Sequence, residues 1–297
     1  LISLLLYGCG GEQTSSFREG KGGIQIGGVF RVNEVMDIRS LHPVEITEVT
    51  GYRVASQVYE GMVRFDQSTL EPIPGLAESW EANENATEWT FRLRKGVKFH
   101  DDTCFENGKG REVKASDVKY CFEQLCTPSA NNQMFWLVKE RLRGAEDYYK
   151  AKANGEKPAG LECIEVLDDY TVKIKLNFPF ASFLRLMGHK AFYIYPKEAV
   201  DAYGDDMTNK AIGTGPFHLK VFQRDELVVL ERNQGYWGVD DFGNQMLIND
   251  AVIMPLYYDE LTRLLPKYVR GLTQNSIEYR DFRRVWIDES QKLDKAE

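Results

Sequence analysis

Two kinds of hydrophobic spacing follow one another along this chain, and together they limit what it can fold into. Residues 89–93 and 172–176 alternate apolar with polar side chains, which is the period of a strand with one buried face. Between them, residues 118–125 place apolar side chains on one stripe of a helix. Because strand and helix patterns are interleaved, the sequence predicts an α/β protein with a mixed α+β sheet.

The same spacing predicts the other elements. Strands are expected at 28–33, 191–195, 217–221, 226–232 and 251–258, and helices at 53–66, 138–154, 179–187 and 196–203. Either Ser116 or Asp117 is the expected N-cap of the helix that carries the 118–125 stripe. Four aromatic side chains are expected in the core rather than at a ligand: Trp80, Trp89, Phe91 and Phe99.

The first nine residues indicate the compartment. Six of the first seven are apolar, and Leu6-Tyr7-Gly8-Cys9 resembles the bacterial lipobox, in which the cysteine is diacylated. No Met or basic segment precedes them, so we expect the chain to begin inside a longer one. The Gly- and Ser-rich stretch 10–23 suits a flexible tether. We predict export to the periplasm or cell surface and a lipid anchor at Cys9; the alternative is a short apolar strand with an unrelated cysteine.

Charge and motifs exclude several classes of function. The 37 basic and 45 acidic residues give a net charge of −8, which argues against binding nucleic acid or anionic lipid through a basic surface. The sequence contains no run of 18 apolar residues and therefore predicts no membrane-spanning helix. The sequence contains no nucleophile elbow, phosphate loop, dinucleotide fingerprint or zinc-protease motif. We therefore expect no enzyme and no cofactor.

Histidines and cysteines predict no metal site. The four histidines are not spaced as ligands, and His100, Asp101, Asp102 and Cys104 are interpreted as a polar loop. An exported protein can form disulfides, but Cys121 and Cys126 lie about 140° apart around their predicted helix. Free, buried thiols are expected at Cys104, Cys121, Cys126 and Cys163. A bridge between Cys104 and Cys163, or another pairing across elements, is the alternative.

Seven short blocks carry a resemblance to a known family. Two are Leu76-Ala-Glu-Ser-Trp-Glu81 and Thr87-Glu-Trp-Thr-Phe-Arg-Leu-Arg-Lys-Gly-Val-Lys-Phe-His-Asp101. The others are Ser40-Leu-His-Pro43, Val58-Tyr-Glu-Gly-Met-Val63, Ala115-Ser-Asp-Val118, Gly213-Thr-Gly-Pro-Phe217 and Arg232-Asn-Gln-Gly-Tyr-Trp237. In this order they resemble the bacterial extracellular solute-binding proteins of family 5, the oligopeptide-, dipeptide- and nickel-binding components of ABC importers. The glycines of 213–217 are expected to supply positive φ angles.

The resemblance implies a fold like that of the type II periplasmic binding proteins. In this fold two lobes hold solute in the cleft between them, and one lobe carries an extension domain. Residues 24–44 and 177–249 then belong to the first lobe, 45–176 to the extension domain and 250–297 to a return segment of the first lobe. Residues 1–9 would end a signal peptide and 10–23 would form the tether.

One departure from the family pattern stands out. In the family the chain leaves the first lobe after a segment like 233–245, builds the second lobe, and returns through a strand like 251–258. Here only residues 246–250 separate the two, so the second lobe is expected to be missing. The return segment is recognisable at 264–272 and 283–288. Because the two crossings lie side by side in this architecture, a short loop can join them and the remainder can still fold.

The resemblance also places ligand contacts on the retained lobe. One group lies in the loop after Pro43: Thr47, Glu48, Val49 and Thr50. The other lies in the loop after the Cys126 helix: Asn132, Phe135 and Trp136. For this second group an ordinary surface loop is the alternative. Glu45 and Glu48 are the candidate partners of a cationic group.

The function implied is a lipid-anchored receptor that delivers short peptides to the permease subunits of an ABC importer. A lost lobe would take with it two charge-assisted contacts to the peptide termini, each worth about 1.5–3 kcal/mol. We therefore expect this form to bind peptide weakly or not at all. One alternative is a single-lobe lipoprotein that docks a permease or another protein without carrying solute. Another is a family member that binds nickel or a nickel chelate.

Overall fold

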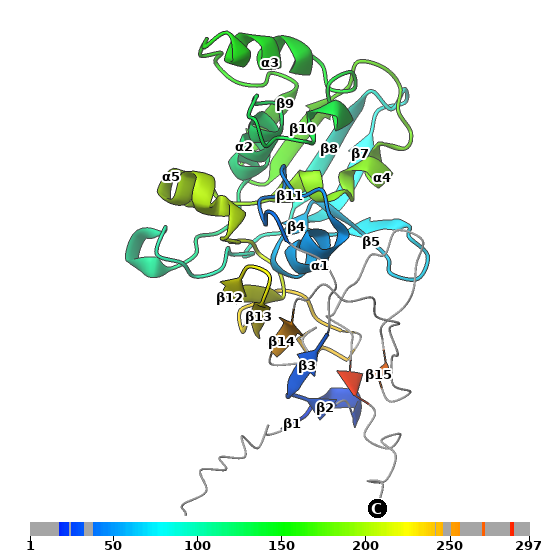
Figure 1. Cartoon of the computed structure of the whole chain (residues 1–297). Coiled ribbons are helices and arrows are strands. Elements are labelled where there is room, and N and C mark those ends of the chain that lie inside the picture. The colour runs from blue at the N-terminus through cyan, green and yellow to red at the C-terminus, as the bar shows by residue number, and fades with distance from the viewer. Residues whose placement is uncertain are drawn as a thin grey trace, which may run out of the picture.

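The computed structural model describes residues 18–23, 25–32, 38–240, 242–245, 251–255, 269–270 and 286–287 (Figure 1). Two four-stranded sheets organise this part of the chain, and α1 (Val49–Val58) lies between them in Figure 1. One cluster of buried side chains extends from Phe30 to Met254 and draws on both sheets. The described residues therefore share a continuous core, and the prediction of a mixed α/β fold is confirmed.

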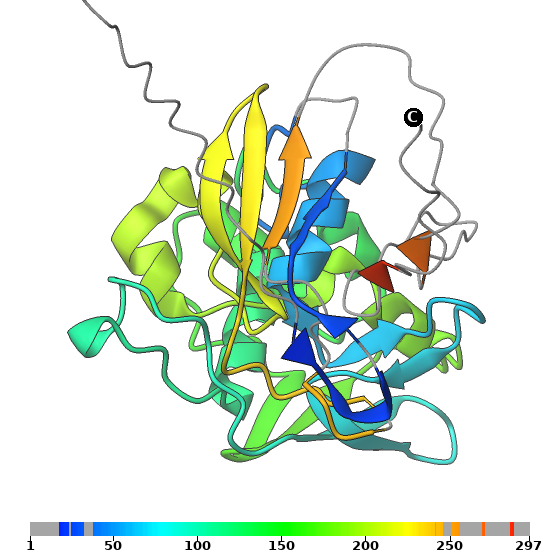
Figure 2. The ribbon, with the colours of Figure 1, turned by 90° about the horizontal axis from the view of Figure 1, so that it is seen from below.

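The first sheet has the strand order β12-β13-β14-β3. Its strands are β12 (Phe217–Gln223), β13 (Leu227–Arg232), β14 (Ala251–Pro255) and β3 (Val29–Arg31). The hairpin predicted for β12 and β13 is present, β13 pairs with β14 antiparallel, and β14 pairs with β3 parallel. Figure 2 shows yellow β12 and β13, orange β14 and blue β3 side by side. The buried strand predicted at 251–258 is therefore present over a shorter range, with Val252 and Met254 buried.

The second sheet has the strand order β7-β8-β10-β9, and all its neighbours are antiparallel. Its strands are β7 (Ala77–Ala82), β8 (Glu88–Leu93), β10 (Thr171–Lys175) and β9 (Ile164–Asp168). The alternating residues of β8 and β10 bury one face, as predicted. Helix α2 (Ala115–Leu125) packs against β9 and β10, and α3 (Ala145–Ala153) lies at the end of the molecule beyond them (Figure 1).

Shorter elements complete the described structure. The remaining helices are α4 (Phe183–Met187) and α5 (Lys197–Tyr203), with 3₁₀ turns η1 (Lys21–Gly23), η2 (Glu106–Gly108), η3 (Phe135–Leu137), η4 (Lys190–Phe192) and η5 (Gly204–Thr208). The two-stranded pairs are β1 (Arg18–Glu19) with β2 (Gln25–Ile26), β4 (Glu60–Gly61) with β11 (Tyr193–Ile194), β5 (Val63–Phe65) with β6 (Pro72–Pro74), and β15 (Val269–Arg270) with β16 (Trp286–Ile287). No helix of the described ranges has both the length and the apolarity needed to cross a bilayer.

Several helix boundaries differ from the prediction: α1 begins at Val49 instead of 53, and α4 begins at Phe183 instead of 179. Local backbone geometry explains two further differences. The helix predicted at 53–66 ends at Val58, since Tyr59 is extended and the next two residues pair with β11. The helix predicted at 138–154 begins only at Ala145, because Gly144 adopts a left-handed conformation with φ of 74°. Its predicted end is correct: Gly155 has φ of 79° and follows directly on the last turn.

The N-cap prediction for α2 was wrong. Lys114 is the N-cap, and Asp117 occupies the third helical position, where its carboxylate accepts the backbone N–H of Lys114 at 2.8 Å. The same carboxylate accepts two hydrogen bonds from the Arg111 guanidinium, at 2.7 and 2.9 Å. Asp117 therefore begins the helix as an acidic residue of a capping box instead of as its cap.

The prediction of free, buried thiols is confirmed for three of the four described cysteines, and Cys104 is free but only half-buried. Cys104, Cys121, Cys126 and Cys163 are free thiols, the last three buried. Cys121 contacts the backbone of Tyr195 through its sulfur, at 3.4 Å to both the N–H and the carbonyl group. Burial raises the pKa of Cys121 and Cys126 well above the ordinary thiol value, so these side chains behave as small apolar groups. Cys9 lies outside the described residues.

Candidate functional site

In the loop after Pro43, the carboxylate of Glu48 forms hydrogen bonds within the loop and with the segment before it. Glu48 precedes the first turn of α1, and one of its oxygens accepts the backbone N–H of Arg39 at 2.7 Å. The other oxygen accepts the hydroxyl of Thr47 at 3.0 Å. Thr50 is buried, whereas Thr47 and Val49 are exposed. Of the four predicted contacts in this loop, Thr47 and Val49 thus present their side chains to solvent, and Glu48 orders the loop.

The second predicted loop also divides into ordering and exposed residues. The Asn132 amide donates to two backbone carbonyls at the end of α2, those of Leu125 and Thr127, both at 3.0 Å. Its carbonyl oxygen accepts the N–H of Met134. Phe135 stacks on Tyr149 of α3 with ring centroids 4.0 Å apart. Trp136 is 64% exposed, so it is the predicted contact of this loop that is open to a ligand.

The structure brings the two predicted loops together. The N–H of Gln133 donates to the carbonyl of Val44 at 3.0 Å, and Asn131 hydrogen-bonds the carboxylate of Glu45. Residues about 90 positions apart along the chain are therefore neighbours. The exposed apolar residues of the two predicted groups lie in helical turns and not in loops: Val49 is the first residue of α1, and Trp136 lies in η3.

Glu45 is held ionised at this junction. Burial works to raise its pKa, but hydrogen bonds from His42 and Ser40 and the charge of His42 outweigh burial and keep the pKa below its ordinary value. The Ser40 hydroxyl donates at 2.8 Å, and the His42 ring nitrogen lies 3.6 Å away. The observed partners of the Glu45 carboxylate, Ser40 and His42, are within the chain, and its role toward a cationic ligand group stays a prediction.

A second polar centre joins blocks that are distant in sequence. The carboxylate of Glu60, in β4, is 6% exposed and accepts three hydrogen bonds. They come from the Thr214 hydroxyl at 2.9 Å, the Tyr236 hydroxyl at 2.9 Å and the Trp237 indole N–H at 2.8 Å. The Arg94 guanidinium lies 4.6 Å above the Trp237 ring. Sequence reasoning missed this centre, whose only signal is a lone acidic residue inside the apolar run 58–63.

The 213–217 block approaches the end of α1 directly, and its glycines serve a different purpose from the one predicted. Neither Gly213 nor Gly215 has a positive φ. Instead, a Cβ on Gly213 would lie 2.1 Å from the carbonyl oxygen of Val58, and a Cβ on Gly215 would lie 2.5 Å from that of Gln57. Gly215 also donates its N–H to Val58 at 2.9 Å. These positions need glycine because two backbones touch.

His100 completes the same junction. Its backbone N–H donates to Gly213 and its ring Nε2 to the carbonyl of Gly215, both at 2.8 Å. The Asn233 amide donates to the same carbonyl at 3.0 Å. His100 is thus a buried structural residue. In the remainder of its predicted polar loop, Asp101 pairs with the nearby Lys109, and Asp102 accepts the hydroxyl of Tyr203, which lies 101 residues away in the sequence.

This geometry gives a pH-dependent stability. Burial lowers the pKa of His100 from 6.5 to about 4, so the folded protein keeps the ring neutral while the unfolded chain takes up a proton below pH 6.5. The stability is therefore complete above pH 6.5 and falls toward pH 4. Between pH 7 and pH 5 we expect the wild type to lose about 2 kcal/mol through this group. Urea unfolding at the two pH values should show that much less loss in His100→Gln.

The control for this experiment is within the chain. His189, whose pKa burial also lowers to about 4, remains in the variant and contributes the same slope to both proteins. The comparison therefore isolates His100. Equal loss in the wild type and in His100→Gln would show that His100 does not carry the effect.

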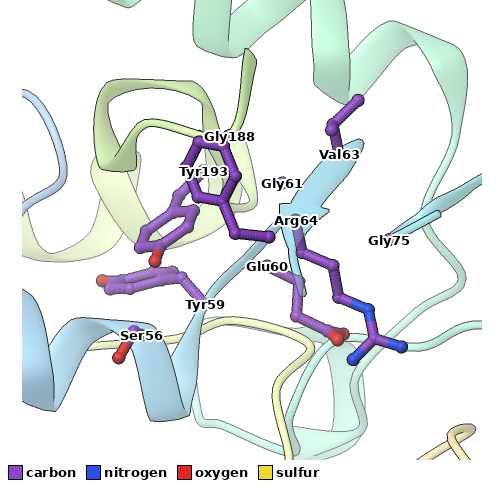
Figure 3. A pocket seen from close by; sticks show the side chains of 10 residues that line it. Ser56, Tyr59, Glu60, Gly61, Val63, Arg64, Gly75, Gly188 and Tyr193 are labelled. Carbon is purple, nitrogen blue, oxygen red and sulfur yellow. The ribbon is translucent and has the colours of Figure 1, made fainter. Parts of the chain in front are cut away.

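A small hollow adjoins the Glu60 centre (Figure 3). Its lining includes Ser56 at the end of α1, Glu60 and Arg64 from β4 and β5, and the rings of Tyr59 and Tyr193, which stack 6.2 Å apart. Its volume of ≈ 20 Å³ has room for about one water. The hollow is too small for a solute. Within the described ranges, no group of three His, Cys, Asp or Glu side chains could hold a metal ion.

Comparison with known proteins shows the family. A sequence profile described as "Bacterial extracellular solute-binding proteins, family 5 Middle" matches residues 71–265. The chain belongs to this family. The resemblance read from the seven blocks is therefore confirmed, and the Glu60 and Gly213 contacts give four of those blocks a structural reason.

The chain is similar to several curated family members over part of their length. It is 31% identical to the periplasmic oligopeptide-binding protein OppA of Salmonella typhimurium, with 75% of this chain and 38% of the relative aligned. It is 34% identical to the dipeptide-binding protein of Escherichia coli, covering 66% of this chain and 36% of the relative. It is 33% identical to heme-binding protein A of Haemophilus influenzae, covering 66% and 35%.

Solved structures confirm the fold. The chain superposes on the periplasmic binding protein DppA of Helicobacter pylori, in complex with the peptide STSA, with a TM-score of 0.66 at 28% identity. That alignment covers 79% of this chain and 43% of DppA. Haemophilus influenzae OppA, in complex with RPPGFSPFR, gives a TM-score of 0.65 at 27% identity, covering 77% and 42%. The chain thus spans well under half the length of these relatives and matches the type II peptide-binding fold over that part.

Proposed function

We propose that this chain is a shortened solute receptor of an ABC importer for short peptides. Family membership supports a solute-binding role, and the relatives named above for oligopeptides and dipeptides support peptide as the solute. The observation that carries the proposal is the hydrogen bond from Gln133 to Val44, which brings the segments that contain the two predicted ligand groups into contact. Val49 and Trp136, one from each group, have exposed side chains.

The proposed division of the chain follows from the sheets. The β12-β13-β14-β3 sheet would belong to the first lobe (24–44, 177–249 and the return segment 250–297), and the β7-β8-β10-β9 sheet to the extension domain (45–176). The second lobe would be missing between β13 and β14, which are separated by residues 233–250 and pair directly in one sheet. The predicted junction 246–250 lies outside the described residues.

The structure describes two short pieces of the proposed return segment. Val269–Arg270 lies in the block recognised at 264–272, and Trp286–Ile287 lies in the block recognised at 283–288. The two pieces pair antiparallel, Val269 with Ile287 and Arg270 with Trp286.

A chain with one lobe would hold peptide poorly. Ligand pockets typically enclose most of their ligand, whereas the exposed residues Thr47, Val49 and Trp136 would form only one side of the proposed site. We propose weak or absent peptide binding, no catalytic activity, and export with a lipid anchor at Cys9. Metabolic labelling with a fatty acid tests the anchor: incorporation in the wild type that persists in Cys9→Ser would refute it.

Thermal unfolding tests the proposal. A solute at a hundred times its dissociation constant stabilises a protein by about 2.7 kcal/mol, which is a shift of several degrees. We expect a mixture of di- to pentapeptides at millimolar concentration to leave the transition of this chain in place. The same mixture should raise that of the Escherichia coli dipeptide-binding protein, the positive control.

The other outcomes are distinct. A shift of several degrees would show that one lobe is sufficient, or that a second copy supplies the opposing face. Loss of that shift in Trp136→Ala would place the peptide at the two loops. Co-purification with permease subunits without any peptide-dependent stabilisation would favour the docking lipoprotein over the receptor.

A further inference from the structure

A polar cavity opens beside the β12–β13 hairpin, away from the two ligand loops. Its volume is ≈ 840 Å³, within the range of small-molecule sites. Its walls are the loop 98–101, the end of β13 with the residues after it (231–235), Gln245, and Arg18 of β1. No residue of the loops 44–50 and 131–136 lines it.

Hydrogen bonds fix each wall of this cavity. Lys98 lies in a bridge with Glu112, and His100 is bound to the 213–215 backbone. On the opposite wall, Asn244 exchanges two hydrogen bonds with the backbone of Lys21, at 2.8 and 2.9 Å, so the β1 region is tied to the loop that ends at Gln245. The shape of the cavity is therefore set before any ligand arrives, which lowers the cost of binding.

The charges in the lining favour an anion. Three cationic side chains line the cavity: Arg18, Lys98 and Arg232. The acidic side chains in the lining, Asp101 and Glu231, form ion pairs with lysines that do not line the cavity.

Those acidic groups are occupied at short range. Asp101 pairs with Lys109 at 2.7 Å, and Glu231 pairs with Lys220 at 2.6 Å. The ammonium group of Lys98 forms no hydrogen bond and no ion pair within the described ranges. It is attracted to Asp101 only at longer range. Lys98 is therefore a cationic group of the lining that no described acidic side chain neutralises at short range.

We propose that this cavity binds a small anion that carries carboxylate or phosphate groups, with Lys98 as a direct contact. Arg18 and Arg232 also line the cavity, Arg232 with a hydrogen bond to Gln245 at 3.0 Å, and Gln234 is a neutral polar neighbour in the lining. A charged ligand held by ammonium and guanidinium groups forms short, strong hydrogen bonds. The proposal does not depend on peptide binding, because the two sites share no residue.

His218 is a built-in reporter of occupancy. Its ring lines the cavity, lies 6.1 Å from the ring of His100 and contacts Glu231 at 3.2 Å. The chain contains four histidines, so their imidazole signals can be resolved and assigned by NMR. An anion in the cavity should shift the His218 signal and leave that of His189, which does not line the cavity, in place.

The experiment is a titration of the chain with citrate and, separately, with inorganic phosphate. Sodium chloride at matched ionic strength gives the baseline. We expect a saturable change of the His218 signal with at least one of the two anions, and a heat of binding by calorimetry with the same dissociation constant. The two arms distinguish a carboxylate from a phosphate ligand.

Two variants locate the contact. Lys98→Ala removes one charge-assisted hydrogen bond and should weaken binding about tenfold or more, and Lys98→Glu should abolish it. Lys157→Ala is the matched control, because Lys157 is exposed and lies outside the cavity. Unchanged melting temperatures show that all three variants fold. The proposal is overturned if neither anion gives a saturable change above the chloride baseline, or if Lys98→Ala binds as tightly as Lys157→Ala.

Discussion

Replacing Glu60 by alanine is expected to lower the free energy of unfolding by about 4–6 kcal/mol, which is a large part of the stability of a protein this size. Three donors lose their acceptor at once: Thr214, Tyr236 and Trp237. Each buried donor left without its charged acceptor costs about 1–3 kcal/mol. Alanine needs no desolvation, which returns part of the loss, but it leaves a cavity where the carboxylate was. Denaturant unfolding measures the difference.

Two further variants make that result specific. Glu60→Gln keeps one acceptor oxygen but turns an amide N–H₂ toward the donors, so about half of the loss is expected. Glu78→Ala removes an exposed carboxylate from β7 and should change stability by less than about 0.5 kcal/mol. If Glu60→Ala unfolds at the same denaturant concentration as Glu78→Ala, the three hydrogen bonds do not hold these segments together.

A methyl group at Gly213 is expected to destabilise the protein by about 4 kcal/mol or more. The new Cβ would lie 2.1 Å from the carbonyl oxygen of Val58 and 2.9 Å from the Cα of Tyr59. Both neighbours are backbone atoms, so no rotamer change relieves the clash, and α1 and the 213–217 segment must separate. Their separation would also break the hydrogen bond from Gly215 to Val58. Circular dichroism at increasing urea concentration would report the loss.

The matched control for this variant is Gly235→Ala. The nearest atom to a Cβ at this position is the Asn233 side chain at 3.5 Å, and the φ angle of Gly235 is not positive. The substitution should therefore be nearly neutral. Equal stability of the two alanine variants would mean that the 213–217 segment can move away from α1 at little cost.

The spacing of apolar residues was sufficient to predict a strand or hairpin where the same alternation of buried and exposed side chains repeats along the whole element. The alternation of β8 and β10 and the β12–β13 hairpin were predicted because one face of each strand is buried. Helix α1 was misplaced because Tyr59 and Met62 continue its apolar stripe, although the backbone turns to pair with β11 after Val58. The spacing of apolar side chains shows which of them are buried, but it does not show a partner strand about 130 residues away.

Prediction of the candidate site from the sequence is limited in the same way. The exposed positions Val49 and Trp136 came from family resemblance, and spacing could not have shown that their segments meet, because a backbone hydrogen bond between Gln133 and Val44 joins them. The roles of Glu48 and Asn132 as ordering residues were missed, since a polar side chain in a loop gives no sign of whether it faces a ligand or its own backbone. The site and these ordering roles both depend on contacts between residues far apart in the chain, and the local sequence does not reveal such contacts.

The parallel pairing of β3 with β14 has a consequence for the order of folding. Val29 meets Ala251, a separation of 222 residues (251 minus 29), and closing a loop of that length costs about 5 kcal/mol of chain entropy. The β7-β8-β10-β9 sheet closes between residues 77 and 175 and can form while later residues are still being synthesised. Strand β3 must wait until β14 has emerged. A nascent chain therefore carries an unpaired N-terminal strand for most of its synthesis. During this period the exposed strand edge is prone to aggregation, which a chaperone would prevent.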